Sequence, residues 1–282
     1  MIRMLILREP VVAGSFYSIN PESLKKEINY CFNHKLGPKS IKKQNVITAI
    51  VPHAGYVYSG PVAAWVYSRL ENANFIILGP NHSGMGSKFA LMRSGIWKTP
   101  LGGVSIHESM AEKLLKECEI LEHDVLAHQY EHSIEVQLPF LQFRFGNDFK
   151  FVPICILNEF ADDTLLEGCR IIGKSIASLI KKEKEKWCII ASSDFSHYIP
   201  QEIAEKIDLS LIKSIIKLDE KEFFEKINEK NASVCGFGPI AVAIVVAKEM
   251  KVKKMKLLKY ATSGDVTEDY SSVVGYASII NF

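Results

Sequence analysis

Short runs of apolar and β-branched residues alternate along the chain with longer stretches in which apolar residues recur at helical spacing. Four of the short runs are continuous and of strand length, which is typical of strands buried on both faces of a sheet. They span residues 46–51, 75–78, 149–157 and 187–191. The alternation predicts an α/β fold, with a central, mostly parallel or mixed sheet flanked by helices.

The helical spacing is clearest between and after these runs. Helices are expected at residues 61–70, 105–119, 164–184, 202–218, 220–230 and 240–250, and two further strands at 255–260 and 272–280. The apolar stretch 131–143 is also helical in pattern, with Pro139 marking a break or kink. No repeat, low-complexity tract or Pro/Gly/Ser-rich linker divides the pattern, so we expect a single α/β domain over residues 1–282.

Composition and charge narrow the class of protein. The chain is 48% hydrophobic, and its 34 basic and 32 acidic residues nearly cancel, so a full core is expected and nucleic-acid binding is not. The apolar run at residues 1–7 is interrupted by Arg3, and no stretch is long enough to span a bilayer, which favours a cytoplasmic protein with no membrane partner. The six cysteines lie far apart, so most are expected to be buried, inert thiols.

Side chains that can bind metals follow three of the predicted strands within a few residues. They are His53, His82, and the pair Asp194 and His197. Because the carboxyl ends of parallel strands meet at one edge of an open sheet, we expect these side chains to converge. Cys235, in a glycine-rich loop before the last helix, joins them if that loop packs over the same edge.

The ligand types indicate the kind of metal. Two imidazoles and a thiolate, from His53, His82 and Cys235, suit zinc, iron or copper better than calcium or magnesium and leave a coordination position open. Each residue has an ordinary alternative. A histidine after a strand is often a hydrogen-bonded loop or surface residue, Cys235 before an apolar helix can be a buried thiol, and Asp194 can cap a turn.

Five short motifs occur along the chain in order. They are P-H-A-G-Y at residues 52–56, L-G-P-N-H at 78–82, E-H-S-I-E at 131–135, S-S-D-F-S-H at 192–197 and C-G-x-x-P-I at 235–240. In these motifs, and in A-G-S-F-Y at 13–17, the chain closely resembles the Memo family, named for mediator of ErbB2-driven cell motility. That family is similar in fold to the class III extradiol ring-cleavage dioxygenases, so the resemblance implies an α/β core with a pocket of the non-haem-iron type.

The resemblance also implies roles for the candidate residues. These are metal ligation by His53, His82 and Cys235, with Asp194 and His197 as catalytic neighbours. His197 matches by motif the histidine that does acid-base work in the dioxygenases. Cys235 stands where the dioxygenases have a carboxylate, and a thiolate is more easily oxidised, so ring cleavage does not carry over. The expected function is metal binding in a dioxygenase-like pocket, with a redox or oxygen-using reaction on iron or copper if the protein is an enzyme.

Two other functions compete with this one. The sequence H-x-x-E-H at residues 128–132 matches the zinc-peptidase pattern in which one helix presents two histidines. Against it, Glu131 and His132 belong to a family motif and His128 does not, and a buried, hydrogen-bonded helix start at Glu131 and His132 is the favoured alternative. The second competitor is a non-enzymatic protein that binds a peptide, an anion or a metal.

The occupant of the pocket is expected to be a small-molecule or peptide ligand. Tyr56 and Phe195 lie beside the candidate ligands in sequence and are candidate pocket walls, although aromatic residues beside strand ends are more often plain core. Binding of phosphotyrosine peptides and of copper has been proposed for the Memo family as a whole.

Overall fold

Four buried parallel strands form the centre of the molecule. The computed structural model describes residues 6–281, so residues 1–5 of the N-terminal apolar run and Phe282 lie outside the described part. The central strands are β2 (Thr48–Val51), β3 (Asn74–Pro80), β8 (Phe151–Ile156) and β9 (Trp187–Ser192). Each coincides with one of the predicted apolar runs and is buried along nearly its whole length, so the expected α/β core is confirmed.

Antiparallel strands extend the sheet on both sides. The strand order is β10-β12-β2-β9-β3-β8-β4-β7, and β11 also pairs with β12. The outer strands are β4 (Phe89–Leu91), β7 (Glu122–His123), β10 (His197–Ile199), β11 (Met255–Thr262) and β12 (Val273–Asn281). Because β2, β9, β3 and β8 run parallel, their carboxyl ends lie next to one another at one edge of the sheet.

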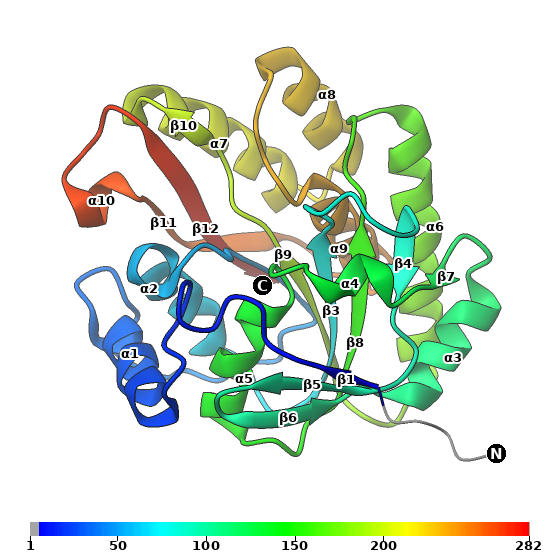
Figure 1. Cartoon of the computed structure of the whole chain (residues 1–282). Coiled ribbons are helices and arrows are strands. Elements are labelled where there is room, and N and C mark those ends of the chain that lie inside the picture. The colour runs from blue at the N-terminus through cyan, green and yellow to red at the C-terminus, as the bar shows by residue number, and fades with distance from the viewer. Residues whose placement is uncertain (1–5, 282) are drawn as a thin grey trace.

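Two groups of helices pack around the sheet (Figure 1). One group is α1 (Pro21–Asn33), α2 (Tyr56–Tyr67) and α5 (Leu138–Phe145). The other is α3 (Glu108–Glu117), α6 (Asp163–Ile180), α8 (Glu220–Lys230) and α9 (Phe237–Glu249). Helix α7 (Gln201–Ile216) packs on β11 and β12. The short helices are α4 (Leu126–Gln129) and α10 (Gly264–Thr267). None of the helices in residues 6–281 has both the length and the apolar content needed to cross a membrane.

The helix expected at residues 131–143 begins later than its pattern indicates. Residues 131–134 are irregular, a single 3-10 turn, η1, covers Glu135–Gln137, and α5 starts at Leu138. Pro139 therefore lies in the first turn of α5, where its missing N–H costs nothing, and it marks the break at which the α-helix begins.

A small second sheet ties down the N-terminal segment. It consists of β1 (Leu7–Arg8), β5 (Ile96–Thr99) and β6 (Gly102–Ser105). The buried carboxylate of Glu135 accepts hydrogen bonds from the backbone N–H groups of Val11 and Val12 and from the hydroxyl of Tyr17. The same carboxylate pairs with Arg8 at 2.5 Å, so η1 and the N-terminal segment form one unit.

Candidate functional site

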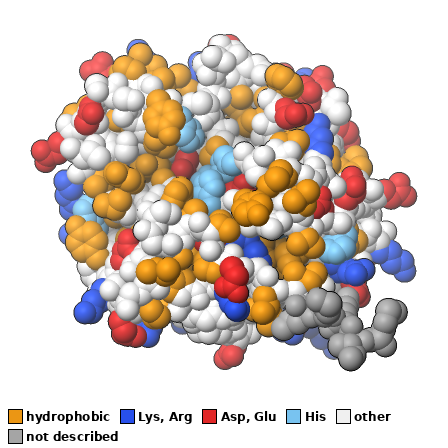
Figure 2. Space-filling model, viewed as in Figure 1, with side chains coloured by type: hydrophobic (Ala, Val, Ile, Leu, Met, Phe, Trp, Pro, Cys, Tyr) orange, Lys and Arg blue, Asp and Glu red, His pale blue; other side chains and the backbone are white. Residues whose placement is uncertain are grey.

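A cavity of about 530 Å³ opens over the carboxyl ends of the central strands. Its polar lining includes His53, His82, His132, Asp194 and His197, and its aromatic walls are Phe16, Tyr58, Tyr198 and Tyr276. Figure 2 shows histidine side chains gathered in a hollow near the centre of this face, bordered by hydrophobic side chains. The topology thus brings residues from six separate segments into one hollow.

Three histidines lie together on the inner side of this cavity. One ring nitrogen from each of His53, His82 and His132 lies within 4.8 Å of one from each of the others. The imidazole centroids of His82 and His132 are 4.7 Å apart and nearly stacked, and His53 meets both rings edge-on. No other group of three such ligands occurs in residues 6–281, so this cluster is the part of the described chain best suited to hold a metal ion.

The carboxylate of Glu131 orients His82. It accepts hydrogen bonds from the backbone N–H of His82 at 2.6 Å and from Nδ1 at 3.0 Å. Burial alone would raise the pKa of Glu131, but the hydrogen bond and the positive charges of His82 and His132 lower it to about 2. The pKa of His82 is in turn raised, because Glu131 outweighs the effect of burial. Nδ1 of His82 is therefore protonated, and Nε2 remains for a metal.

His53 follows β2 and is held at two points. Its backbone N–H donates to Oδ1 of Asp194 at 2.8 Å, and its Nδ1 lies 2.8 Å from the hydroxyl of Ser192. Burial, reinforced by the neighbouring imidazoles, lowers the pKa of His53 well below its usual value, so the ring is neutral at physiological pH. A neutral imidazole is the form that binds metals.

Cys235 lies beside His53 at the start of α9. Its Sγ is 3.3 Å from Nε2 of His53 and accepts a hydrogen bond from the backbone N–H of Asp194 at 3.2 Å. The carbonyl of Cys235 accepts from Nδ2 of Asn158, which follows β8. All six cysteines are free thiols and only Cys235 is partly exposed, which agrees with the expectation that most are buried. Cys235 is not a member of the three-histidine group, and its role as a ligand stays a prediction.

Asp194 and His197 occupy the wall next to the cluster. Burial raises the pKa of Asp194 to about 6 against the opposing effect of the backbone N–H groups that it accepts from, chiefly that of His53. Nδ1 of His197 lies 2.7 Å from the carbonyl oxygen of Ser233, which can only accept, so Nδ1 carries a proton and Nε2 is free. Both residues line the cavity, and their catalytic roles stay predictions.

The donor set fits a metal ion of borderline or soft character. Two of the three histidines have Nδ1 engaged by an oxygen partner, which is the usual arrangement around metal-binding imidazoles. Nδ1 of His132 lies 3.6 Å from the same Glu131 carboxylate. Imidazole nitrogens with a thiol alongside suit zinc, iron or copper, as the sequence predicts.

His132 is the member of the cluster that sequence reasoning missed. It follows no strand, and we expected it to be part of a buried helix start. Instead it lies in the irregular segment between α4 and η1, with its ring against Phe16 at 4.9 Å. The one feature of the sequence that pointed to His132 was its position next to Glu131 in one of the five motifs.

The peptidase pattern is not realised. Helix α4 ends at Gln129, so His128 and His132 do not share a helical face. His128 is fully buried, with Nδ1 3.2 Å from Sγ of Cys155 and its ring against Trp97. His128 neither lines the cavity nor belongs to the three-histidine group, so it does not share a site with His132.

Tyr56 and Phe195 are core residues, and the suggestion that they form pocket walls is wrong. Tyr56 is 1% exposed and donates its hydroxyl proton to the carbonyl of Val136, and Phe195 is fully buried. Tyr56 is the first residue of α2 and its ring packs against Phe140 in the protein interior, which leaves Tyr58, two positions on, to face the cavity.

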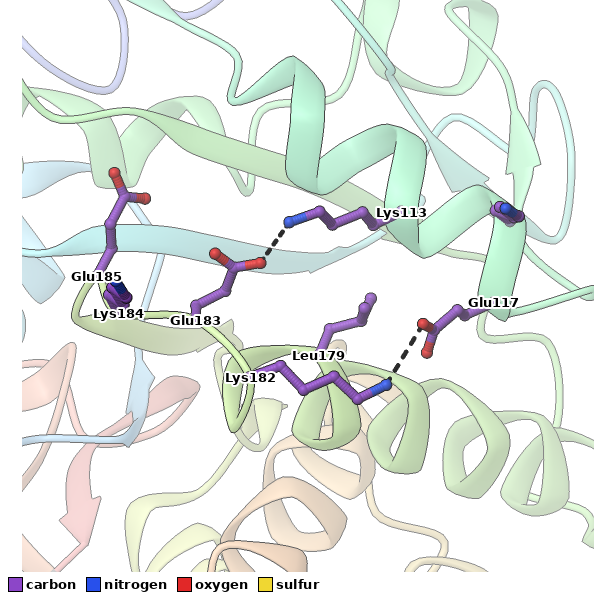
Figure 3. Close-up of a pocket in the computed structure, with 8 residues that line it drawn as sticks. Lys113, Glu117, Leu179, Lys182, Glu183, Lys184 and Glu185 are labelled. Carbon is purple, nitrogen blue, oxygen red and sulfur yellow. Dashed lines mark hydrogen bonds and ion pairs between the residues drawn. The ribbon is translucent and has the colours of Figure 1, made fainter.

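A larger hollow of about 650 Å³ lies elsewhere, between α3 and the end of α6 (Figure 3). Its side chains are mainly lysines and glutamates, of which Lys113 pairs with Glu183 and Lys182 with Glu117. Exposed ion pairs of this kind contribute little and carry no reactive group. Size therefore does not identify the site here, whereas the chemistry of the histidine cavity does.

Comparison with known proteins agrees with the motifs. The model of the Memo family, described as Memo-like protein, matches residues 8–280. A MEMO1 family protein of Methanopyrus kandleri is 45% identical, over 97% of this chain and 98% of its own. Another, of Methanococcoides burtonii, is 47% identical, over 97% and 99% respectively.

A solved structure shares the fold at much lower identity. An uncharacterized protein from Escherichia coli K12 superposes with a TM-score of 0.53 and 12% identity, covering 84% of this chain and 100% of its own. That likeness concerns the fold alone. The family match and the two relatives, each aligned over nearly the whole chain, establish that this protein belongs to the Memo family.

Proposed function

We propose that this protein binds a zinc, iron or copper ion through His53 and His82, with His132 or Cys235 as the third ligand. The observation that carries the proposal is the three-histidine cluster, whose ring nitrogens lie within 4.8 Å of one another inside a cavity open to ligands. The engaged Nδ1 atoms of His53 and His82 support it, because they leave the other nitrogen of each ring available to a metal.

We further propose that a small-molecule or peptide ligand enters the outer part of the cavity and undergoes a redox or oxygen-dependent reaction. A bound iron or copper ion would supply electron transfer and an open position for oxygen or substrate. His197 would take up a proton at its free Nε2, and Asp194 would accept a hydrogen bond from a substrate hydroxyl. The rings of Phe16, Tyr58 and Tyr276 would bury the apolar part of the ligand.

Metal analysis of purified variants tests the first proposal. We expect His53→Ala and His82→Ala to lose the metal that the unaltered protein carries after purification without added metal. A parallel loss in either His132→Ala or Cys235→Ala identifies the third ligand. His123→Ala is the matched control, because His123 is on strand β7, outside the cavity. Full metal content in His53→Ala would overturn the proposal.

Oxygen uptake tests the second proposal, that the protein carries out a redox or oxygen-dependent reaction. The protein is loaded with iron or copper without air and then exposed to oxygen with a panel of phenolic and thiol compounds. Uptake that depends on compound and metal, and that falls in His197→Gln, supports an oxidoreductase. A fully loaded protein that consumes no oxygen with any compound would favour a binding protein over an enzyme.

A further inference from the structure

His53 begins a buried chain of hydrogen bonds that leads away from the cavity. The hydroxyl oxygen of Ser192 lies 2.8 Å from Nδ1 of His53, 2.7 Å from Nε2 of Gln137 and 2.8 Å from the carbonyl oxygen of Ser133. Ser192 is the last residue of β9, and Gln137 is in η1. These side chains are 2% exposed or less. The direction of each hydrogen bond is therefore set by the protein groups and not by solvent.

The direction of each bond follows from what the atoms can do. A carbonyl oxygen only accepts, so the single hydroxyl proton of Ser192 is donated to Ser133. The amide of Gln137 also has a fixed orientation, because its nitrogen lies 3.1 Å from the carbonyl oxygen of Pro52, where an oxygen would be repelled. On the other side, Oε1 of Gln137 accepts from the hydroxyl of Tyr67. Nε2 of Gln137 therefore donates to Ser192.

Only one role remains for His53. The hydroxyl proton of Ser192 is donated to the carbonyl oxygen of Ser133. The hydroxyl oxygen of Ser192 can therefore only accept a hydrogen bond from Nδ1 of His53. The neutral ring must then carry its proton on Nδ1, and Nε2 presents a lone pair. Nε2 is the atom that lies 3.3 Å from Sγ of Cys235, on the side of the candidate metal site.

We infer that Ser192 and Gln137 are positioning residues that hold His53 in the tautomer with the proton on Nδ1, and so select Nε2 as its ligand atom. The value of this selection for function rests on the proposed metal site. Glu131 performs the same task for His82 with a charged group, so the two imidazoles are oriented by different chemistry. Ser192 orients His53 without adding negative charge to it.

Nitrogen NMR of the metal-free protein tests the tautomer directly. Histidine ring nitrogens labelled with ¹⁵N show whether each is protonated, and the signals of His53 are assigned by their loss in His53→Gln. At pH 7.5 we expect Nδ1 of His53 to be protonated and Nε2 to be bare. A proton on Nε2 in the unaltered protein would overturn the inference without the need for any variant.

Removal of the serine hydroxyl tests the cause. In Ser192→Ala we expect both tautomers of His53 to be populated, and the affinity for zinc to fall about 10- to 100-fold. Ser278→Ala is the matched control, because the Ser278 hydroxyl is equally buried and donates to a carbonyl, that of Val62, away from the cavity. An unchanged tautomer in a folded Ser192→Ala protein would contradict the inference.

The two proposals fail in different ways. If Nδ1 of His53 is protonated but none of zinc, iron and copper binds at His53, the tautomer inference stands and the metal proposal is overturned. If a metal binds but His53 carries its proton on Nε2, or its tautomer does not depend on Ser192, the metal proposal stands and the tautomer inference is overturned.

Discussion

The carboxylate of Glu131 contacts His82 at two atoms, the backbone N–H at 2.6 Å and the imidazole Nδ1 at 3.0 Å. The same carboxylate accepts from the backbone N–H of Ser133 at 2.7 Å and lies 3.6 Å from Nδ1 of His132. One buried, ionised group therefore fixes the loop after β3 to the segment before η1. The contacts of Glu131 therefore bring His82 and His132 together.

Glu131→Gln should weaken metal binding about 10- to 100-fold, because an amide cannot accept at both oxygen positions and carries no charge. The pKa of His82 should fall, since Glu131 contributes more than Asp194 to raising it. A competition titration with a metal indicator measures the affinity, and NMR titration of the metal-free protein measures the pKa.

The matched control for this change is Glu220→Gln. Glu220 is also a nearly buried, paired carboxylate, bound to Lys248 and Arg170, but it does not line the cavity. Equal metal affinity in Glu131→Gln and the unaltered protein would show that Glu131 has only a structural role.

Gly236→Ala should displace the loop that carries Cys235. An added Cβ would lie 2.5 Å from the carbonyl oxygen of Ser192 and 2.6 Å from Cβ of Ser193, so the chain must move away from the end of β9. We expect a loss of about 1–3 kcal/mol in the free energy of unfolding and faster reaction of the Cys235 thiol with a labelling reagent.

Gly55→Ala provides the comparison, because its added Cβ would meet other atoms only at 3.6 Å or more. Urea unfolding and the rate of thiol labelling are measured on both variants. Identical results for the two variants would mean that the close approach at Gly236 does not hold the loop in place.

Arg8→Met should destabilise the protein by about 3–5 kcal/mol, because it leaves the buried carboxylate of Glu135 without its cation. The guanidinium of Arg8 also lies 4.0 Å over the ring of Trp97 and donates to the carbonyl of Glu131 at 2.5 Å. The free energy of unfolding in urea is the measurement. In the double variant with Glu135→Gln the loss should be smaller than the sum of the two single losses, and strict additivity would contradict a coupled pair.

Asp208 should make stability depend on pH. Burial raises its pKa to about 6, against the opposing hydrogen bonds from Ser196 and Tyr260. A carboxyl group with a raised folded pKa is favoured in its protonated form, so its contribution is fully present below its ordinary value of 3.8 and is lost as the pH rises through about 6. The loss corresponds to about 3 kcal/mol, at about 1.4 kcal/mol per pKa unit.

Comparison with Asp208→Asn isolates this effect, because all other titrating groups are shared. The free energy of unfolding of the original protein, measured relative to that of the variant, should decrease between about pH 4 and pH 6 and level off above. A difference that stays constant over this interval would show that the pKa of Asp208 is not raised in the folded protein.

Local sequence patterns were enough to predict the sheet and part of the site. Continuous apolar runs of strand length, such as residues 187–191, are typical of strands covered on both faces, so the local pattern predicted their structure. Because parallel strands end at one edge, the positions of His53 and His82 after two such strands predicted that they would lie close together, as their 5.3 Å ring separation shows.

Local patterns could not predict that His132 belongs to the site or how the imidazole rings are oriented, because both depend on contacts between distant segments. His132 follows no strand, and it reaches the site because the buried Glu131 bonds to a loop 49 residues earlier. The tautomer inferred for His53 depends likewise on Ser192 and Gln137, from β9 and η1. Contacts between distant segments leave no periodic pattern in the sequence, because their stability comes from burial and hydrogen bonding that exist only after the chain has folded.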